Sequence, residues 1–517
     1  MKYRIKDYPD IKEKVERMSV DELLAKIIIP HLTPNVDYCP KVEETRDNFG
    51  VFVFTSAAED CIKMARDIND GREEKALVVS DIENGAGSAL IGGVAFPSLR
   101  AVAETGEPEY AYKMGKYTAE EMRRAGYHWA FGPCVDILGN KDCPVLSLRS
   151  PGDTVEEVLD YAGGYMRGLQ DNGMIATIKH FPGDGYGTDD QHVTVPVNPL
   201  SKDEWYAQFG KVYKQLIDEG AMAVMPGHIS LPAFDDKDEY MDMYPPATVS
   251  KKVLGDLLRG ELGFEGLIVS DAVNMGGFCG YMNWFEANAK FLEAGGDCLL
   301  FQYYKDEYRE GMKKQLENGN LSMETLKNRA YRNLCFARQY FDEHSDIPEF
   351  DREEAEKCAE EVTRKSVRLV RDRSKTLPAK LDKNSKVLHV IMTQIDYPLE
   401  APHELTERLK EICGTVDVMD DPRPWLIKEA VLTGEYDYVF VTAGVFATYG
   451  LNTVRLAGEV TRNMMEGWMR FGTPCIFICN GHPYFADQFK GLTDTVINTY
   501  GYNKYTNDRV MEIILGK

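Results

Sequence analysis

Short apolar runs alternate with longer stretches of helical pattern between about residue 50 and residue 345. This alternation is typical of repeated strand–helix units, in which each run is a buried strand of a parallel sheet. Seven runs are clear and an eighth is not: 51–54, 76–79, 129–131, 175–178, 221–225, 267–269 and 298–301. No dinucleotide-binding glycine pattern occurs early in the chain. A closed, TIM-type (β/α)8 barrel therefore accounts for the runs better than an open sheet.

A second set of apolar runs follows the first, at 387–392, 438–444 and 474–478. Helical stretches separate these runs, which predicts a smaller, doubly wound α/β domain, an αβα sandwich. The charged segment between the two sets has a helical pattern. We expect a barrel domain over 1–345, a helical linker over 346–385 and a C-terminal α/β sandwich over 386–517.

Composition narrows the class of protein. The chain has 517 residues and a formal net charge of −23, which argues against nucleic acid or an anionic membrane surface as a partner. The start of the chain has no apolar signal region, and no apolar stretch approaches the roughly 20 residues of a membrane span. Eleven cysteines without a Cys-x-x-Cys pattern fit reduced thiols. We expect a cytoplasmic enzyme of small molecules; the sequence is silent on its oligomeric state.

Five consecutive apolar runs end in titratable or hydrogen-bonding side chains. In chain order these are Asp81, Asp136, the pair Lys179 and His180, His228 and Asp271. One Asp at a strand end is commonplace because Asp caps helices well, but capping alone does not explain five such ends. The carboxyl ends of barrel strands converge on one face, where active sites lie. The sequence therefore predicts a site there for a polar substrate with many hydroxyl groups.

The segment 179–192 carries the strongest chemical signal in the chain. Lys179 and His180 close an apolar run, a loop rich in Gly and Pro follows, and the loop ends in Asp190-Gln191-His192. An Asp two residues before a His can orient the imidazole and stabilise its cation, as a general acid/base requires. The glycines do not form a phosphate-binding P-loop, because no Gly-Lys-Ser/Thr follows them.

These residues resemble glycoside hydrolase family 3, specifically its bacterial β-N-acetylglucosaminidase (β-hexosaminidase) branch in a two-domain form. The segment 179–192 matches the branch's Lys-His-Phe-Pro-Gly loop with its closing Asp-x-His. The Gly-Phe-x-Gly run 263–266 ahead of Ser270 and Asp271 matches the family's nucleophile strand. The segments 131–136 and 224–229 fall in the expected order. The second domain resembles the family's C-terminal sandwich through 481–484.

The resemblance implies an exo-acting, retaining β-N-acetylglucosaminidase that removes terminal β-linked GlcNAc from a small-molecule or oligosaccharide substrate. Asp271 would be the nucleophile that forms a glycosyl-enzyme intermediate. His192 would be the general acid/base, and Asp190 would orient it. The resemblance implies neither a cofactor nor a metal. It places a further set of residues on the sugar: Asp81, Asp136, Arg149, Lys179, His180 and His228.

Three departures from the family pattern bear on the substrate. Asp184 stands where the family's loop commonly has His, and Ala272 stands where a second Asp often follows the nucleophile. Glu83-Asn84-Gly85 replaces a Glu-Gly-Gly that usually has an Arg beyond it, and no Arg occurs here between Arg72 and Arg100. The catalytic residues are untouched. These departures concern the part of the site that binds the leaving group. The sequence therefore leaves the leaving group undetermined and does not predict a cell-wall substrate in particular.

Three alternatives stay open. A neutral His repels inorganic phosphate less than a carboxylate would, so phosphate could replace water and make the protein a β-N-acetylglucosaminide phosphorylase. A non-catalytic sugar-binding protein is a second alternative, which the presence of Asp271, Asp190 and His192 disfavours. Metal-assisted hydrolysis by His180, His192 and His228 is a third, but the sequence has no His-Glu-x-x-His or tight ligand spacing.

Overall fold

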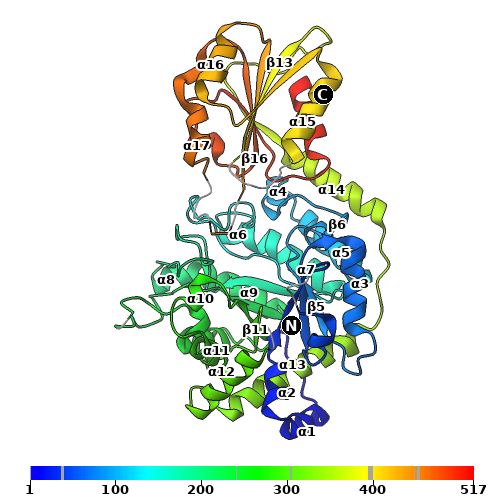
Figure 1. Cartoon of the computed structure of the whole chain (residues 1–517), viewed down its shortest axis with the longest axis vertical. Coiled ribbons are helices and arrows are strands. Elements are labelled where there is room, and N and C mark those ends of the chain that lie inside the picture. Colours follow the sequence, from blue (N-terminus) through cyan, green and yellow to red (C-terminus); the bar gives the residue numbers. More distant parts are fainter. Residues whose placement is uncertain are drawn as a thin grey trace. The chain divides into compact units, whose positions relative to one another are not determined.

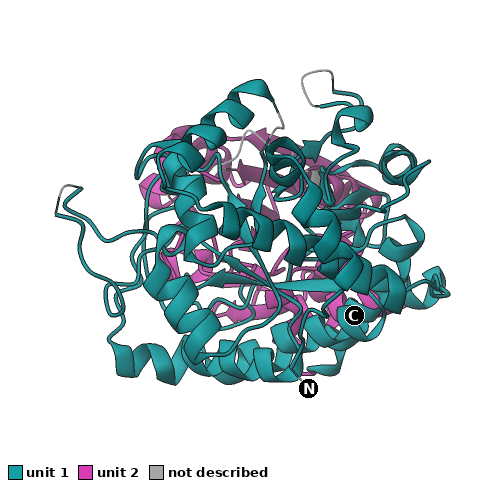
Figure 2. Cartoon of the chain, turned by 90° about the horizontal axis from the view of Figure 1, so that it is seen from below, with its two compact units in different colours: residues 1–95, 108–140, 150–356 teal, residues 96–107, 141–149, 357–517 magenta. Residues whose placement is uncertain are grey.

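The computed structural model describes residues 2–36, 40–239, 241–302, 305–393, 400–446, 449–450 and 455–517. The chain divides into two compact units, coloured separately in Figure 2. Unit 1 comprises Met1–Ala95, Pro108–Asn140 and Ser150–Glu356, and unit 2 comprises Phe96–Glu107, Lys141–Arg149 and Lys357–Lys517. Two short segments that interrupt the barrel sequence therefore belong to the second unit. The predicted domain boundaries at 345 and 385 remain a proposal.

Unit 1 is a parallel barrel (Figure 1). Its strands are β1 (Ile28–Ile29), β2 (His31–Leu32), β3 (Gly50–Val53), β5 (Leu77–Ser80), β7 (Trp129–Ala130), β8 (Ile175–Phe181), β9 (Ala223–Pro226), β10 (Leu267–Ala272) and β11 (Cys298–Leu300). Each pairs in parallel with its neighbours, in the order β1-β11-β10-β9-β8-β7-β5-β3-β2. The predicted barrel is confirmed.

The first strand of the barrel is broken into β1 and β2 by Pro30. Ile28 and Ile29 pair with β11, whereas His31 and Leu32 pair with β3, so the two pieces together close the circle. Proline has no amide hydrogen to donate to a ladder and therefore interrupts the pairing. The eighth strand was indistinct in the sequence because each piece has only two residues.

Helices surround the barrel strands. They are α1 (Pro9–Arg17), α2 (Val20–Ala25), η1 (Val42–Thr45), α3 (Ala58–Asn69), η2 (Ala86–Ser88), α5 (Glu109–Arg124), α6 (Val155–Glu157), η3 (Val158–Ala162), α7 (Gly163–Asp171), α8 (Lys202–Trp205), η4 (Tyr206–Gly210), α9 (Lys211–Glu219), η5 (Ala247–Val249), η6 (Lys252–Glu261), α10 (Gly276–Cys279), α11 (Trp284–Ala294), α12 (Asp306–Glu317) and α13 (Met323–Glu343). A small ladder joins β4 (Ser56–Ala57) to β6 (Leu90–Ile91). Among the residues described, every helix is too short or too polar to cross a lipid bilayer.

Unit 2 is built on a six-stranded sheet of order β12-β17-β16-β15-β13-β14. The strands are β12 (Arg368–Asp372), β13 (Lys386–Thr393), β14 (Thr415–Asp420), β15 (Tyr438–Val445), β16 (Cys475–Gly481) and β17 (Thr495–Asn498). All ladders are parallel except that between β12 and β17. This is the predicted doubly wound domain, with an antiparallel edge strand added.

Both faces of the unit 2 sheet are covered by helices. The helices are α4 (Leu99–Glu104), α14 (Arg352–Ser366), α15 (Glu400–Ile412), α16 (Pro424–Leu432), α17 (Gly458–Thr461), η7 (Arg462–Arg470), α18 (Phe485–Gln488) and α19 (Thr506–Leu515). Leu409 of α15 and Val510 of α19 belong to one buried cluster. Ile427 of α16 and Trp468 of η7 belong to a second buried cluster. Figure 1 shows α15 and α16 on opposite sides of the sheet.

Candidate active site

The polar strand ends predicted from the sequence lie on five strands that are neighbours in the barrel, β5, β7, β8, β9 and β10. Because these strands are parallel, the residues that close them occupy one continuous arc at the carboxyl end of the barrel. Lys179 and His180 are the last polar residues of β8, and Asp271 is the penultimate residue of β10. The structure therefore gathers the predicted strand-end residues of unit 1 at one site.

Asp271 presents a partly covered carboxylate at this site. Its side chain is 14% exposed, its Oδ1 accepts the Ala272 amide at 2.8 Å, and its Oδ2 lies 3.9 Å from His180 Nε2. Burial works to raise the pKa of the Asp271 carboxyl, but nearby basic side chains, His180 first among them, outweigh burial and hold the pKa below its ordinary value of 3.8. The carboxylate is therefore ionised and accessible at neutral pH.

Asp190 and His192 form a tight pair in the loop after β8. His192 Nδ1 lies 2.6 Å from Asp190 Oδ1, and the same oxygen accepts the His192 backbone amide at 2.8 Å. Asp190 is fully buried, whereas the His192 side chain is 25% exposed. Since Asp190 occupies Nδ1, the proton that His192 can exchange with solvent or substrate is the one on Nε2.

The buried carboxylate of Asp136 holds the His180 side chain in place. The His180 Nδ1 lies 2.8 Å from Asp136 Oδ2, and the backbone amides of His180 and Asp184 also donate to this carboxylate. Asp136 is fully buried, which raises its pKa, but His180 and these donors outweigh burial and lower the pKa below its ordinary value. Asp184, the departure from the family loop, therefore has its backbone tied to the same anchor.

Lys179 is buried to 97% and holds two carboxylates. Its Nζ lies 2.8 Å from Glu83 Oε1 and 3.1 Å from Asp81 Oδ1. The Asp81 side chain is 54% exposed, whereas that of Glu83 is 16% exposed. Asp81 can therefore reach a ligand while Glu83 balances the buried lysine. Glu83 is not among the residues predicted from the sequence; its position two residues after Asp81 is the signal that could have indicated it.

His228 is fully buried at the end of β9, and both of its ring nitrogens are engaged. The Nδ1 atom lies 3.0 Å from Thr248 Oγ1, and Nε2 lies 3.1 Å from the carbonyl oxygen of Ala272. Burial lowers the pKa of the His228 imidazole to about 4, so the ring is neutral at pH 7. A neutral ring beside a carbonyl carries its hydrogen on Nε2 and accepts from Thr248. The predicted sugar contact of His228 stays a prediction.

Arg149 is the one predicted site residue that belongs to unit 2. It closes the segment Lys141–Arg149, and its Nη1 donates to the Val145 carbonyl at 3.2 Å. The same segment contributes Ser147, whose Oγ lies 2.9 Å from His482 Nδ1 within unit 2. The predicted role of Arg149 in sugar binding stays a prediction.

The three histidines of the metal alternative do not gather as ligands. Among the residues described, the group whose ligand atoms lie within 4.8 Å of one another is Cys134, Asp136 and His180. Their atoms already hydrogen-bond to each other, with Cys134 Sγ 3.1 Å from Asp136 Oδ2. This geometry is that of a buried hydrogen-bond network that orients His180.

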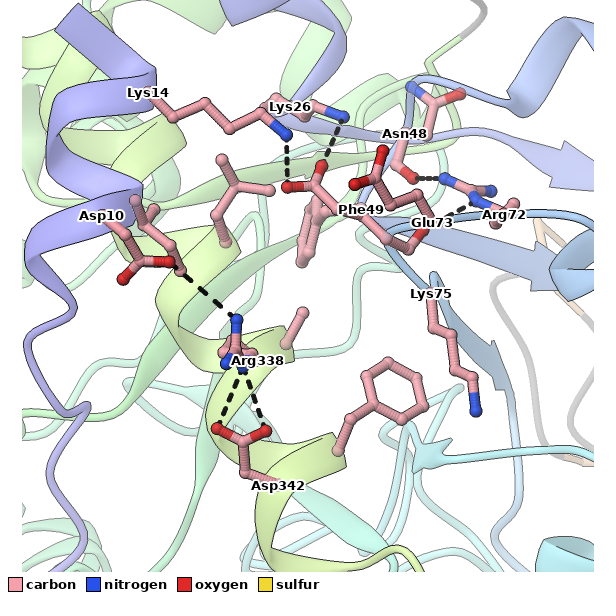
Figure 3. A pocket seen from close by; sticks show the side chains of 15 residues that line it. Asp10, Lys14, Lys26, Asn48, Phe49, Arg72, Glu73, Lys75, Arg338 and Asp342 are labelled. Carbon is pink, nitrogen blue, oxygen red and sulfur yellow. Dashed lines mark hydrogen bonds and ion pairs between the residues drawn. The ribbon is translucent and has the colours of Figure 1, made fainter.

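A cavity of about 350 Å³ opens elsewhere in unit 1 (Figure 3). Lys26, Phe49 and Arg72 line it, and these residues precede β1, β3 and β5. The cavity is therefore at the amino end of the barrel strands, opposite Asp271. Figure 3 shows Arg338 between two acidic side chains, with Asp342 at 3.0 Å and Asp10 at 4.0 Å. This cavity does not belong to the candidate active site.

Comparisons with known proteins agree with this geometry. The glycosyl hydrolase family 3 N-terminal domain matches residues 46–335, which is more than half of the chain. A β-N-acetylglucosaminidase/β-glucosidase of Cellulomonas fimi is 26% identical over 98% of this chain and 93% of that protein. A β-hexosaminidase of Haemophilus influenzae is 29% identical over 53% of this chain and 76% of that protein.

Two solved structures extend the similarity to the whole chain. A β-glucoside phosphorylase bound to 2FGlc has a TM-score of 0.89 and 25% identity, and the match covers 100% of this chain and 96% of that one. A family 3 β-N-acetylglucosaminidase of Paenibacillus sp. has a TM-score of 0.81 and 22% identity, covering 96% of this chain and 97% of that one. The second likeness bears on the fold, because its identity is low.

Proposed function

This chain belongs to glycosyl hydrolase family 3, and we propose that it is an exo-acting, retaining β-N-acetylglucosaminidase. Its substrate is a small molecule or oligosaccharide with a terminal β-linked GlcNAc. One observation carries the proposal: an ionised carboxylate, Asp271, shares the carboxyl end of the barrel with a His192 whose Nδ1 is held by Asp190. The named activities of relatives in Cellulomonas fimi and Haemophilus influenzae support the choice of sugar.

In the first step Asp271 attacks the anomeric carbon and forms a glycosyl ester. The bond to the leaving oxygen breaks, and His192 Nε2 donates a proton to that oxygen as negative charge develops on it. Asp190 stabilises the imidazolium before the transfer, because its buried carboxylate lies 2.6 Å from Nδ1. The leaving group departs as a neutral alcohol.

In the second step water attacks the anomeric carbon from the face that the leaving group vacated. His192, now neutral, takes the proton from water, and Asp271 is released as a carboxylate. Two inversions give net retention of the β-configuration. The low pKa of Asp271 favours this release, because a carboxylate that is stable as an anion is a better leaving group.

Sugar binding is assigned to the polar groups around Asp271. Asp81 has the exposed carboxylate, and Lys179 and His180 supply donors from β8. Asp136 and His228 act through the groups that they hold, and Arg149 keeps its predicted role in sugar binding. The free thiols of the described cysteines, nearly all buried, support a reducing, cytoplasmic setting.

A direct test uses 4-nitrophenyl β-N-acetylglucosaminide and the matching β-glucoside, each with and without inorganic phosphate. Free GlcNAc that is first released as the β-anomer, read by NMR, is the expected product. Release of the α-anomer would contradict the retaining mechanism. Binding of GlcNAc without turnover of either substrate would favour a non-catalytic sugar-binding protein.

Phosphorolysis is the second candidate, and a specific observation favours it. The solved structure that matches this chain over its full length at a TM-score of 0.89 is a β-glucoside phosphorylase. A neutral His192 presents less negative charge to an incoming phosphate than a carboxylate acid/base would. In the same assay, sugar 1-phosphate appearing in place of free sugar when phosphate is added would establish a phosphorylase.

A further inference from the structure

We propose that Gln191 is a positioning residue that latches the acid/base loop to the strand of the nucleophile. The proposal rests on the proposed function, because it concerns how His192 is held relative to Asp271. The latch consists of the Gln191 side chain, the His228 backbone and ring, and the backbone amides of Gly276 and Gly277. None of the sequence motifs pointed to it.

The Gln191 side chain is buried away from solvent. The residue is 1% exposed, and its Oε1 accepts the backbone amide of His228 at 2.8 Å. A Cβ atom placed on Gly227 would lie 2.8 Å from this Oε1 and 3.0 Å from the Cβ of His180. The amide of Gln191 is therefore wedged between the ends of β8 and β9, in a space that Gly227 leaves open.

His228 carries the connection onward to the nucleophile strand. Its Nε2 lies 3.1 Å from the carbonyl oxygen of Ala272, the residue after Asp271. The backbone amide of His228 thus donates to Gln191 Oε1, while its ring donates to the Ala272 carbonyl of β10. Through this single residue, a side chain adjacent to His192 is linked to the peptide adjacent to Asp271.

The loop backbone makes a second connection, to the start of α10, which follows the nucleophile strand β10. The Gly276 amide donates to the His192 carbonyl at 2.8 Å, and the Gly277 amide donates to the Gln191 carbonyl at 3.1 Å. A Cβ on Gly276 would lie 2.6 Å from the Val193 carbonyl oxygen, and one on Gly277 would lie 2.7 Å from that of Gln191. The close approach therefore requires glycine at both positions.

Together these hydrogen bonds tie Gln191 and His192 to the segment 272–277 that follows Asp271. They fix the backbone of both loop residues, which constrains the orientation of the His192 ring relative to Asp271.

The test compares Gln191→Met, which keeps length and burial but removes the acceptor, with Gln208→Met as a matched control. The Gln208 side chain, on η4, accepts a hydrogen bond from the Tyr186 hydroxyl. Tyr186 lies in the middle of the same loop, away from the end that carries His192. Aryl β-glycosides with leaving phenols of graded acidity report on proton donation. For Gln191→Met we expect kcat/KM to fall about tenfold or more on a phenyl glycoside and to change little on a dinitrophenyl glycoside.

Gln208→Met should lose no such selectivity. An equal loss on both substrates, or none, in Gln191→Met would overturn the latch. A third outcome is that His192→Ala shows the expected dependence on the leaving group while Gln191→Met behaves like wild type. That result would overturn the latch and leave the proposed function standing.

A second measurement is independent of activity. Amide hydrogen exchange of a peptide that contains the Gly276 and Gly277 amides should be faster in Gln191→Met than in wild type or Gln208→Met, because these amides donate to the loop and their hydrogen bonds open more often. Unchanged exchange would refute the latch even if the sugar assignment were wrong. Gly277→Ala, which pushes the loop off by steric contact, should reproduce the effect of Gln191→Met in both measurements.

Discussion

His180 Nε2 lies 3.9 Å from Asp271 Oδ2, while the other ring nitrogen of His180 lies 2.8 Å from the buried carboxylate of Asp136. The imidazole thus stands between two carboxylates, one fully buried and one accessible. Asp136 therefore holds the His180 ring in place beside the nucleophile. A substitution at Asp136 is therefore expected to affect Asp271 by changing the position of His180.

The substitution Asp136→Asn tests this path. The amide group of Asn would face donors from His180, Asp184 and Cys134, so a buried donor must oppose another donor. We expect the free energy of unfolding to fall by about 2–4 kcal/mol, with a large loss of kcat/KM. Urea unfolding and steady-state kinetics measure both. Cys134→Ala, which removes one weak donor, should cost less than about 1 kcal/mol, and an equal cost would argue against the Asp136 hub.

His192→Ala should affect substrates unequally. A nitrophenolate leaves with little help, whereas an alcohol needs a proton from His192 Nε2. We expect kcat/KM to fall about 100-fold or more on an oligosaccharide and much less on the dinitrophenyl glycoside. The ratio of the two losses is the measurement. Equal losses would assign His192 to binding instead of proton transfer.

Two adjacent aspartates give a matched comparison. Asp190 is buried and contacts the Nδ1 atom of the His192 ring, whereas Asp189 is exposed. Asp190→Asn removes the charge that stabilises the imidazolium and can reverse the ring tautomer, so we expect kcat to fall by about 100-fold or more. Asp189→Asn should stay within about twofold of wild type. Similar kinetics for the two variants would contradict the role of Asp190.

Much of the fold could be predicted from the sequence, because the barrel strands are buried on both faces and read as apolar runs. The missing barrel strand is split by Pro30, so neither half is long enough to form a run. In unit 2, β14 exposes most of its side chains and carries Asp417 and Asp420, so it shows no apolar run. The segments Phe96–Glu107 and Lys141–Arg149 belong to unit 2 because of contacts with residues far away in the sequence. Local sequence patterns do not indicate such contacts.

The site was predictable where chemistry and strand ends coincide, as at Asp271, His180 and the Asp190–His192 pair. The roles of Glu83 and Gln191 cannot be predicted from the sequence, because each depends on the buried partner that the side chain meets in space. Lys179 needs a second carboxylate once it is 97% buried, and only the fold shows that Glu83 supplies it. Likewise, Gly276 and Gly277 read as an ordinary turn until the approach of the His192 loop is seen.

A pH effect on stability is expected in unit 2. His389 is fully buried between Thr406 and Thr442, and burial lowers its pKa from 6.5 to about 3. The folded state therefore keeps His389 neutral while the unfolded chain binds a proton below pH 6.5, so stability is full above that pH and is lost as the pH falls toward 3. Between pH 7 and pH 5 this amounts to about 2 kcal/mol.

Urea unfolding of unit 2 at a series of pH values measures the effect. His389→Gln should flatten the slope between pH 7 and pH 5, whereas His403→Gln, at an exposed position, should leave the slope as in wild type. An unchanged slope in His389→Gln would show that other groups carry the pH dependence.

The proposed mechanism depends above all on a covalent glycosyl–Asp271 intermediate. A 5-fluoro β-N-acetylglucosaminyl fluoride forms such an ester quickly and releases it slowly, because fluorine destabilises the oxocarbenium-like transition states. Peptide mass spectrometry of the inactivated protein should place one sugar on the peptide that contains Asp271, and Asp271→Asn should take up none. Labelling of a different carboxylate, or turnover of the fluoride without any adduct, would contradict the assignment of Asp271 as the nucleophile.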